Sequence, residues 1–509
     1  MRKLLSALLA LTMLFGMMSF AVAEEEPLRI TIVCPFYGET APVGTEMGNK
    51  TNPVLLAAEK LGNVELDITW SPQGDYLTKF STVMASQNVP MVMVVTSGLT
   101  TNANYLDMCE AGVFWDLTEK IKERPFFAEI APQSNLDVTS VSGHNYLFPA
   151  ATSSARVGVI YRLDWLEKLG LEAPTNLESF KAMVAGFTDN DPDGNGTKDT
   201  IGFAYCDNGD KELTYAGFNT LACMLGAPNN WGIDSEGKLL PYFMFDEYYD
   251  TLDLFNWMYV NGYMNADFAV NTDKHGPLKE GVSGSMITTA TNSRYPGGKY
   301  DSLIDNIEPT AKLGLQQILY KADGTPVLNS TLNPGGLGGI LIPKASVKDE
   351  ATLDRILDFI ETLNDEGGIL TAVGVEGVHY TKESDGTLSI SAEQKQARTD
   401  DGSSEVFASM FPRRIQSLDY GQGMTDVQKI TAVSIANEPY TVSDMSIGFI
   451  SSDMQSLQTE ISTTISDARV KYIMGQIDKD GFKAAVDEWL KLGGQQIIDD
   501  VNANYNAAK

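Results

Sequence analysis

The sequence predicts an α/β fold of two lobes, with parallel-rich sheets flanked by helices. Strand-like and helix-like segments alternate from residue 28 to residue 96, and a second series begins near Gly143. Extended or glycine-rich stretches lie where the chain would pass between the two series. Alternation at this spacing is typical of right-handed βαβ units in mainly parallel sheets. The sequence has no internal repeat and no low-complexity linker, so we expect short strands to join the lobes.

The first series supplies the start of one lobe. Three of its segments are short and apolar, as buried strands are: 28–36, 64–70 and 90–96. Two segments between them have the apolar spacing of amphipathic helices: 52–62 and 74–87. Ligands of such sheets bind beyond the carboxyl ends of the parallel strands. The loops after Phe36, Trp70 and Thr96 are therefore expected on one rim.

The second series begins with an extended stretch through Pro149. Further strands are predicted at 157–161, 201–206 and 284–290. Helices are predicted at 163–170, 176–187, 212–226, 248–262 and 350–364. The glycine-rich passage 333–343 precedes the last of these helices, and the chain from about Met424 onward has a mostly helical pattern.

The N-terminus predicts export. Residues 1–23 comprise two basic residues, an apolar run and the small-residue site Ala21-Val22-Ala23, as in a secretory signal cleaved after Ala23. The first cysteine after the run is Cys34, which lacks the small-residue context of a lipid attachment site. We therefore expect a protein without a lipid anchor in the periplasm, outside the cell or at its surface. No later segment approaches the roughly 18 apolar residues of a membrane span, so no membrane insertion is expected after cleavage.

Charge and cysteine usage exclude several classes of protein. Loss of Arg2 and Lys3 with the signal leaves 35 basic against 67 acidic residues, a formal charge of −32. Such a surface repels nucleic acid, and no basic stripe reverses the repulsion locally. The four cysteines, Cys34, Cys109, Cys206 and Cys223, are too few for a disulfide scaffold, although an oxidising compartment would permit a bridge.

An ordered set of motifs then resembles a known family. The set comprises GHNYLFP (143–149), VIYRLDWLEKLGL (159–171), DPDGNGTKDT (191–200), GAPNNW (226–231), WMYVNGYMNADF (257–268) and the closing stretch 471–506. In this order the motifs are similar to extracellular solute-binding proteins, family 1, of ABC importers. The likeness is greatest to the large branch that carries oligosaccharides, and it covers essentially the whole mature chain.

The resemblance implies a periplasmic-binding-protein-like fold of type II, in which a hinge joins two lobes and a ligand is enclosed between them. It implies crossings near Phe148-Pro149, near 333–335 and around residue 400. The N-terminal lobe would comprise 24–148 and 336–400, and the C-terminal lobe 149–335 and 401–509. It further implies a monomeric, non-enzymatic binding protein that closes on an oligosaccharide and delivers it to permease subunits.

The sequence departs from the family pattern in two places. The lipid-anchor cysteine common in Gram-positive members is missing, which puts membrane attachment in doubt. The turn ASQNVP (85–90) also lacks the glycine and aspartate usual at that corner. A ligand contact expected from this corner is therefore in doubt.

The loop DPDGNGTKDT has the spacing of a calcium loop. Calcium takes six to eight oxygen ligands, and calcium loops place glycine at position six and a carbonyl ligand at position seven. Counting from Asp191 puts Gly196 at position six. The ligands at positions one, three, five, seven and nine are then Asp191, Asp193, Asn195, the Thr197 carbonyl and Asp199. Gly202 at position twelve replaces the usual glutamate, so water, Thr200 or a neighbouring loop would complete the shell.

The alternative is a turn without metal, in which Asp and Asn side chains bond the local backbone. Three carboxylates this close repel one another unless a cation lies between them, which favours calcium. The resemblance supports the same register, because some oligosaccharide-binding relatives carry a calcium loop here. The isolated His144, His275 and His379 form no zinc motif, so the expected calcium is structural.

Sugar sites combine flat aromatic platforms with amide, carboxylate and guanidinium groups. Strand ends and polar turns select these candidate ligand contacts: Tyr37, Trp70, Tyr76, Trp231, Asn292, Arg294 and Tyr295. For each aromatic, core packing is the competing role. The negative charge of the chain argues against polyanionic ligands, although Arg294 or Arg156 could pair a single uronate carboxylate.

Two other functions stay open. A secreted carbohydrate-active enzyme would need two carboxylates across a sugar bond, and the number of acids does not exclude such a pair. The sequence has no GxSxG nucleophile motif, since GVSGS (281–285) lacks the final glycine. A binding protein for amino acids, peptides or a metal is the other alternative.

Overall fold

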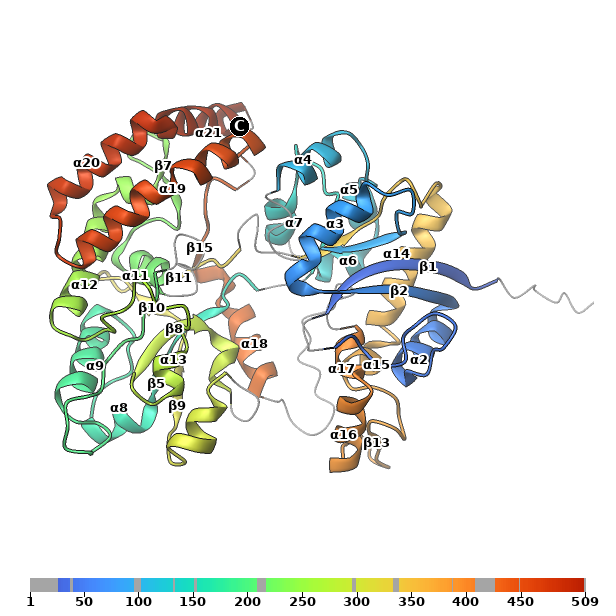
Figure 1. Cartoon of the computed structure of the whole chain (residues 1–509), viewed down its shortest axis with the longest axis horizontal. Helices are drawn as coiled ribbons and strands as arrows, with labels where there is room; N and C mark the ends of the chain where they lie inside the picture. Colours follow the sequence, from blue (N-terminus) through green and yellow to red (C-terminus); the bar gives the residue numbers. More distant parts are fainter. Residues whose placement is uncertain are drawn as a thin grey trace, which may run out of the picture.

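The computed structural model of the chain forms two lobes (Figure 1). The described residues are 26–36, 40–95, 102–130, 133–150, 153–207, 217–294, 299–332, 338–386, 388–407, 426–447 and 449–507. The expected signal segment 1–23 and the candidate contacts Tyr37 and Tyr295 lie outside them. We call the part built on β1 the first lobe and the part built on β5 the second lobe.

A five-stranded sheet in the order β2-β1-β3-β12-β4 forms the centre of the first lobe. Its strands are β1 (Leu28–Phe36), β2 (Val64–Pro72), β3 (Val92–Val95), β4 (Phe148–Pro149) and β12 (Gly339–Leu341). β1 pairs in parallel with β2 and β3, as the alternating pattern predicts. β12 pairs antiparallel with β3 and β4, because the chain returns from the second lobe and not through a βαβ crossover.

Helices cover both faces of this sheet. Alternate residues of β1 point to opposite sides, so Ile30, Ile32 and Cys34 pack in the core formed with α2 (Pro53–Gly62) and α14 (Glu350–Asn364). Val33 packs in the core formed with α3 (Tyr76–Met84) and α4 (Ala103–Glu110). α14 has the bounds that the sequence predicts. The other elements of this lobe are η1 (Gln73–Asp75), α5 (Thr118–Glu123), α6 (Pro125–Ile130), α7 (Gln133–Thr139), α15 (Gly368–Ala372), β13 (Thr381–Lys382), β14 (Leu388–Ser389), α16 (Ala392–Asp400) and α17 (Ser403–Val406).

The chain stays with the first lobe beyond the expected boundary at residue 400. Val406 and Phe407 are buried in the core that holds β1 and α14. The Asn52 side chain, which caps α2, also donates a hydrogen bond of 2.9 Å to the Asp401 carbonyl. Residues 401–407 therefore belong to the first lobe, not to the second lobe as the resemblance implies.

The second lobe contains a three-stranded sheet in the order β8-β5-β9. β5 (Val157–Arg162) pairs antiparallel with both β8 (Ser285–Thr289) and β9 (Leu313–Gln316). The regular ladders of this three-stranded sheet are therefore antiparallel, although a mainly parallel sheet was expected. Regular parallel ladders join β1 to β2 and β3, and β11 (Pro326–Asn329) to β15 (Thr441–Val442). Isolated parallel bridges also join Met286 of β8 to Ala204, and Tyr320 to Asn176. The remaining short strands are β6 (Trp231–Ile233), β7 (Leu239–Pro241) and β10 (Leu319–Tyr320).

The strand predicted at 201–206 is not a regular strand. It makes only isolated bridges, in which Ile201 pairs with Ser283, Phe203 with Met264 and Ala204 with Met286. Gly202 explains the irregular path, since a side-chain carbon there would lie 2.1 Å from the Val184 carbonyl oxygen of α9 (Leu177–Asp189). The segment therefore runs against this helix, and its apolar side chains still pack in the core.

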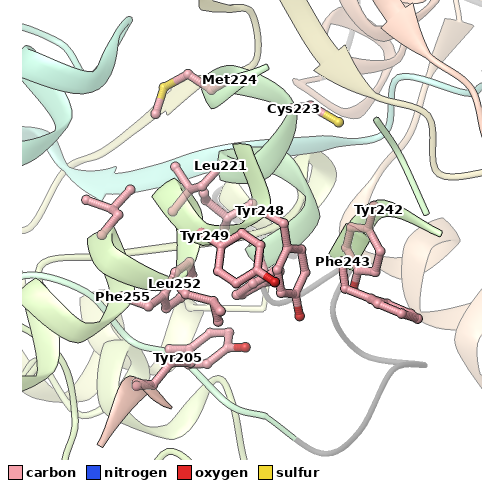
Figure 2. Packing of buried hydrophobic residues seen from close by; sticks show 14 of the residues in the cluster. Tyr205, Leu221, Cys223, Met224, Tyr242, Phe243, Tyr248, Tyr249, Leu252 and Phe255 are labelled. Atoms are coloured by element: carbon pink, nitrogen blue, oxygen red, sulfur yellow. The ribbon is translucent and has the colours of Figure 1, made fainter. Parts of the chain in front are cut away.

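The core of the second lobe is rich in aromatic rings (Figure 2). The Tyr205 ring lies tilted against Phe255, with ring centroids 4.7 Å apart, and the Phe255 centroid lies 4.9 Å from that of Phe218. The chain from residue 426 is mostly helical, as predicted. The helices of this lobe not yet named are α8 (Leu163–Leu169), α11 (Phe218–Leu225), η3 (Tyr242–Met244), α12 (Asp246–Val260), α13 (Gly276–Lys279), η5 (Leu303–Ile307), α18 (Asp426–Asn437), α19 (Ser452–Ile473), α20 (Lys479–Trp489), η7 (Leu490–Gly494) and α21 (Gln495–Ala507).

The lobes meet through crossing segments, through α4 and α19, and through a small apolar contact. One crossing runs from β4 to β5 and another from β11 to β12, and the Thr331 N–H donates a 2.8 Å hydrogen bond to the Ser154 carbonyl between them. Val138 of α7 packs with Leu332 and Ile447. The relative position of the lobes in this structure therefore depends in part on residues far apart in sequence.

All four cysteines are buried and free of disulfide bonds. The sequence left open whether a disulfide bond forms, and this structure contains none among the four cysteines. Each lobe is therefore stabilised by apolar packing of its own core and not by a covalent cross-link. In the described part of the chain, no helix combines the length and apolar character needed to span a bilayer.

Candidate functional site

One end of the second-lobe sheet brings polar candidates together. The 3-10 helix η4 (Ala290–Ser293) follows β8, and Arg294 follows η4. The Ala290 N–H donates a 2.7 Å hydrogen bond to the Arg156 carbonyl, which ties η4 to the residue that precedes β5. Asn292 and Arg294 are half-buried, and the Arg294 guanidinium donates to the Thr291 carbonyl at 3.1 Å. Two of the predicted ligand contacts therefore lie in one rigid turn beside Arg156.

The Gln317 side chain fixes α18 against this turn. Its amide nitrogen donates to the carbonyls of Ala155 and Val157, at 3.0 and 3.3 Å, and to the Ser434 hydroxyl of α18 at 2.9 Å. These carbonyls flank Arg156 in the chain, and α18 also contacts η4. One buried amide thus holds α18, η4 and Arg156 next to one another.

The exposed side of α18 is apolar from Val433 onward, after the exposed Lys429. α18 continues into the 3-10 helix η6 (Glu438–Tyr440), and together they expose Val433, Ile435 and Tyr440. The exposed fractions of Val433 and Tyr440 are 51% and 44%. In Figure 1, α18 lies on the margin of the second lobe that is turned toward the first lobe. We refer to the exposed residues Val433, Ile435, Ala436, Pro439 and Tyr440 as the α18–η6 face.

This face is not among the ligand contacts predicted from the sequence. The run TAVSIANEPY (431–440) contains more apolar residues than a short helix can bury on one side, and this excess was the available signal. The backbone next to Tyr440 is well anchored. The Glu438 carboxylate accepts a 3.2 Å hydrogen bond from the Ser154 N–H, and Thr441 pairs with Leu328 of β11. The backbone on both sides of Tyr440 is thus held beside the crossing segment at Ser154 and beside β11.

Two predicted aromatic contacts are core residues. Tyr76 is fully buried, and its hydroxyl donates to the Val33 carbonyl at 2.9 Å. Trp231 is 3% exposed and packs in the core of the second lobe. Burial of both rings in this structure favours core packing, the competing role of each aromatic, and their role as ligand contacts stays a prediction. Within the GAPNNW motif, Asn229 makes the contact to the segments near the crossings. Its side-chain amide donates hydrogen bonds to the carbonyls of Ser330 and Val442.

Trp70 is the described aromatic candidate of the first lobe that keeps solvent access. It is half-buried near the carboxyl end of β2, and its indole N–H donates to the Thr45 hydroxyl at 2.9 Å. Thr45 in turn donates to the Pro42 carbonyl at 2.9 Å. These hydrogen bonds orient the indole on the first lobe, apart from the second-lobe group around Arg294.

The acidic loop folds around the Asn195 side chain. The Asn195 amide nitrogen lies 2.8 Å from one Asp193 carboxylate oxygen and 3.1 and 3.2 Å from the two oxygens of Asp199. The Asp191 carboxylate accepts hydrogen bonds from the N–H groups of Gly194 and Gly196, both at 3.1 Å. Side chains at positions one, three, five and nine of the predicted register therefore turn inward.

The donor chemistry of this loop suits a cation. Desolvation raises the pKa of Asp193, and the neighbouring Asp191 and Asp199 raise it further against the hydrogen bond from the Asn195 N–H. Turning over the Asn195 amide would point its oxygen, instead of its nitrogen, at the carboxylates. In the described chain, however, no three His, Cys, Asp or Glu side chains form a ready-made metal cage. The residues that would hold calcium are Asp191, Asp193, Asn195, the Thr197 carbonyl and Asp199.

Comparison with known proteins identifies the family. The family model described as "bacterial extracellular solute-binding protein" matches residues 41–368, more than half of the chain. The chain belongs to this family. It is 30% identical over 462 residues to the polygalacturonan/rhamnogalacturonan-binding protein YtcQ of Bacillus subtilis, covering 89% of this chain and 87% of YtcQ. It is 29% identical over 488 residues to the lipoprotein LipO of the same organism, covering 94% and 93% of the two chains.

A solved structure supports the fold assignment. The structure of an HMO-binding, ABC-transporter-associated solute-binding protein from Bifidobacterium longum infantis matches with a TM-score of 0.68. The match covers 95% of this chain and 99% of that chain at 16% identity. The predicted α/β, two-lobed, periplasmic-binding-protein-like class is therefore confirmed.

Proposed function

We propose that the chain is the extracytoplasmic substrate-binding component of an ABC importer and that it binds an oligosaccharide between its lobes. The α18–η6 face carries this proposal. Sugar rings present apolar C–H faces that stack on exposed aromatic and aliphatic side chains, and their hydroxyl groups bond amides and charged groups. Tyr440 would supply the platform, Asn292 and Arg294 the polar contacts, and Trp70 the contact from the first lobe.

Closure of the lobes would couple binding to transport. The crossing segments join lobes that have separate cores, so the lobes can move as rigid bodies. A ligand that contacts both lobes favours the closed arrangement by its additional contacts. A permease that recognises the closed form of a monomer would then receive the loaded protein, and no catalytic step is required.

Calorimetry against a panel of oligosaccharides tests the proposal. We expect saturable binding of at least one sugar, together with a decrease in the radius of gyration measured by X-ray scattering. Amino acids, peptides and free metal ions form the comparison panel. Tight binding of one of these instead, or release of reducing ends from any sugar, would overturn the proposal and favour one of the open alternatives.

We propose that the 191–200 loop binds a structural calcium ion in the Asp191 register. The convergence of Asp193 and Asp199 on Asn195 supports this assignment. The ion would neutralise the carboxylates and stiffen the connection between α9 and the segment that starts at Ile201. Calcium does little to acidify a bound water, and the loop is assigned no catalytic role.

The double variant Asp193→Ala with Asp199→Ala tests the metal. We expect calcium to raise the melting temperature of the parent and a chelator to lower it, whereas the double variant should respond to neither. Asp234→Ala is a matched control, since Asp234 also accepts backbone hydrogen bonds in a turn. A parent whose melting is indifferent to calcium and chelator would show that the loop is only a turn.

We further propose that the chain is exported and cleaved after Ala23. The apolar run and the Ala21-Val22-Ala23 site support this proposal. Mass spectrometry of the protein from the producing cell should find Glu24 at the mature N-terminus. A mature protein that retains residues 1–23 would refute the cleavage.

A further inference from the structure

Two arginines at one end of the second-lobe sheet have no carboxylate partner among the described residues. Arg156 precedes β5, and its guanidinium makes no hydrogen bond, ion pair or ring contact with the described part of the chain. Arg294 donates only to the Thr291 carbonyl of its own turn. Both side chains are half-buried, so part of their hydration is already lost.

Other arginines of the chain do have carboxylate partners. With 67 acidic residues against 37 basic ones, carboxylates are plentiful. Four other arginines bind carboxylates directly, at 2.5 to 2.8 Å: Arg29 with Asp67, Arg124 with Asp358, Arg162 with Asp164 and Arg469 with Asp207. A half-buried guanidinium that keeps its five donors unused by carboxylates is suited to an anion from outside the chain.

The backbone holds the two arginines close to the proposed sugar platform. The Ala290 N–H bonds the Arg156 carbonyl at 2.7 Å, and Arg294 lies one turn of η4 further along. Gln317 joins the carbonyls on both sides of Arg156 to Ser434 of α18. The backbone of Arg156 and the η4 turn that leads to Arg294 therefore lie next to α18, which carries part of the α18–η6 face.

A third basic residue, Lys299, lies on the same turn of this otherwise acidic protein. Burial and then the charges of Lys274, Lys299 and Lys279 lower the pKa of His275 to about 4, while Asp273, which pairs with Lys279, acts in the opposite direction. Lys299 belongs to the same turn as Arg294, since its N–H donates to the Asn292 carbonyl at 3.2 Å. Arg156, Arg294 and Lys299 thus give this corner of the second lobe a positive charge that opposes the net charge of the chain.

We propose that Arg156 and Arg294 bind the carboxylate of a uronic acid residue, and that the transported ligand is an acidic oligosaccharide. This inference rests on the proposed binding function. A uronate offers an apolar ring face for Tyr440 and a planar carboxylate that accepts paired N–H groups from a guanidinium. The sugar and its charge would thus be recognised by adjacent parts of the same surface.

Methyl esterification supplies the sharpest test, because it removes the charge of a uronate and changes its shape little. Calorimetry would compare oligogalacturonides, alginate oligomers and glucuronate-bearing xylan fragments with their methyl esters. We expect one acid form to bind at least about tenfold more tightly than its ester. The variants Arg156→Gln and Arg294→Gln should each weaken the acid form by about tenfold or more and leave the ester nearly unchanged.

Arg29→Gln is the matched control, because Arg29 pairs with Asp67 on the first lobe, away from this region. It should leave the binding of both forms unchanged. Equal affinity for acid and ester, tight binding of neutral sugars only, or preference for a sulfated or phosphorylated sugar would overturn the uronate assignment while the oligosaccharide function stands. Failure to bind any sugar would instead overturn both proposals.

Discussion

Tyr440 offers a test of the sugar platform with a single side chain. Tyr440→Ala should weaken oligosaccharide binding by about tenfold, because stacking against an aromatic ring is lost. Tyr320→Ala is the control, since the Tyr320 ring of β10 has a similar exposed fraction, 41%. Calorimetry should find normal affinity in the control. Equal affinity in both variants would remove Tyr440 from the site.

A second prediction for a single residue concerns Asp444. It is 9% exposed and accepts hydrogen bonds from the Ser446 N–H and hydroxyl, yet no described cation pairs with it. Burial raises its pKa to about 6. The folded pKa thus exceeds the unfolded one, so this group's contribution to stability is present below about pH 4 and is lost as the pH rises through about 6.

Asp444→Asn should therefore stabilise the protein at pH 7.5, by about 1–3 kcal/mol, and do so less at pH 5. Chemical denaturation at the two pH values measures this difference. The exposed Asp250→Asn should show no such pH-dependent gain. A gain of the same size at both pH values would contradict the expected titration.

Single residues also show where prediction from sequence stops. Asn292 and Arg294 could be placed in one polar turn after a strand, because strand and turn are local patterns. The burial of Tyr76 and Trp231 depends on helices and strands from distant parts of the chain. An aromatic residue after a predicted strand therefore does not reveal which side of the sheet its ring will occupy.

At the scale of elements, one buried ion pair fastens α19 to the rest of the second lobe. The Arg469 guanidinium binds the Asp207 carboxylate at 2.8 and 2.9 Å, and both side chains are almost fully buried. Arg469→Met should cost roughly 3–5 kcal/mol, because a buried carboxylate would lose its cation. Adding Asp207→Leu should recover much of that loss in denaturant unfolding.

Arg29→Met, which breaks the exposed pair with Asp67, is the control and should leave the unfolding midpoint unchanged. If Arg469→Met behaved like this control, the buried pair would not be what fastens α19. If the double variant were no more stable than Arg469→Met, the loss would come from packing of the arginine stem and not from an uncompensated charge.

Regular elements were predictable in proportion to their local periodicity. α14 buries Leu353, Ile356, Leu357 and Ile360 at helical spacing, and β1 is a continuous apolar run. The segment 201–206 has the composition of a strand, but the close approach of Gly202 to α9 prevents regular pairing. The antiparallel pairing of β5 with β8 and β9 was not predicted either, because the direction of a strand is set by the path of the chain through other elements.

At the scale of the whole molecule, net charge and local charge oppose each other. The formal charge of −30 should slow the approach of a uronate ligand, although a positive corner holds it once bound. Raising the salt from about 10 mM to about 300 mM should therefore increase the association rate several-fold, because screening weakens the long-range repulsion. Stopped-flow tryptophan fluorescence measures this rate.

The dissociation rate should rise over the same range of salt, since the local ion pairs are screened too. The methyl ester of the same sugar should show little change in either rate. An association rate for the acid form that falls with salt would mean that the positive corner, and not the net charge, governs the approach of the ligand.

The two-lobed fold followed from two series of alternating segments and from the order of the motifs. The contact between the lobes did not, because Val138, Leu332 and Ile447 are few in number and far apart in sequence. Nor did the expected boundary at residue 400 hold, since Val406 and Phe407 fill the core of the first lobe. These features depend on three-dimensional packing, for which no local pattern exists.

The buried cysteines have a practical consequence for spectroscopy. Burial raises the pKa of Cys34 well above its usual value and that of Cys109 and Cys223 to about 12. Thiols in this state react slowly with maleimides and methanethiosulfonates. A pair of cysteines introduced on the surface, one on each lobe, should therefore accept dyes or spin labels against a low background. Distances between such probes would report the motion of the lobes directly in the otherwise natural chain.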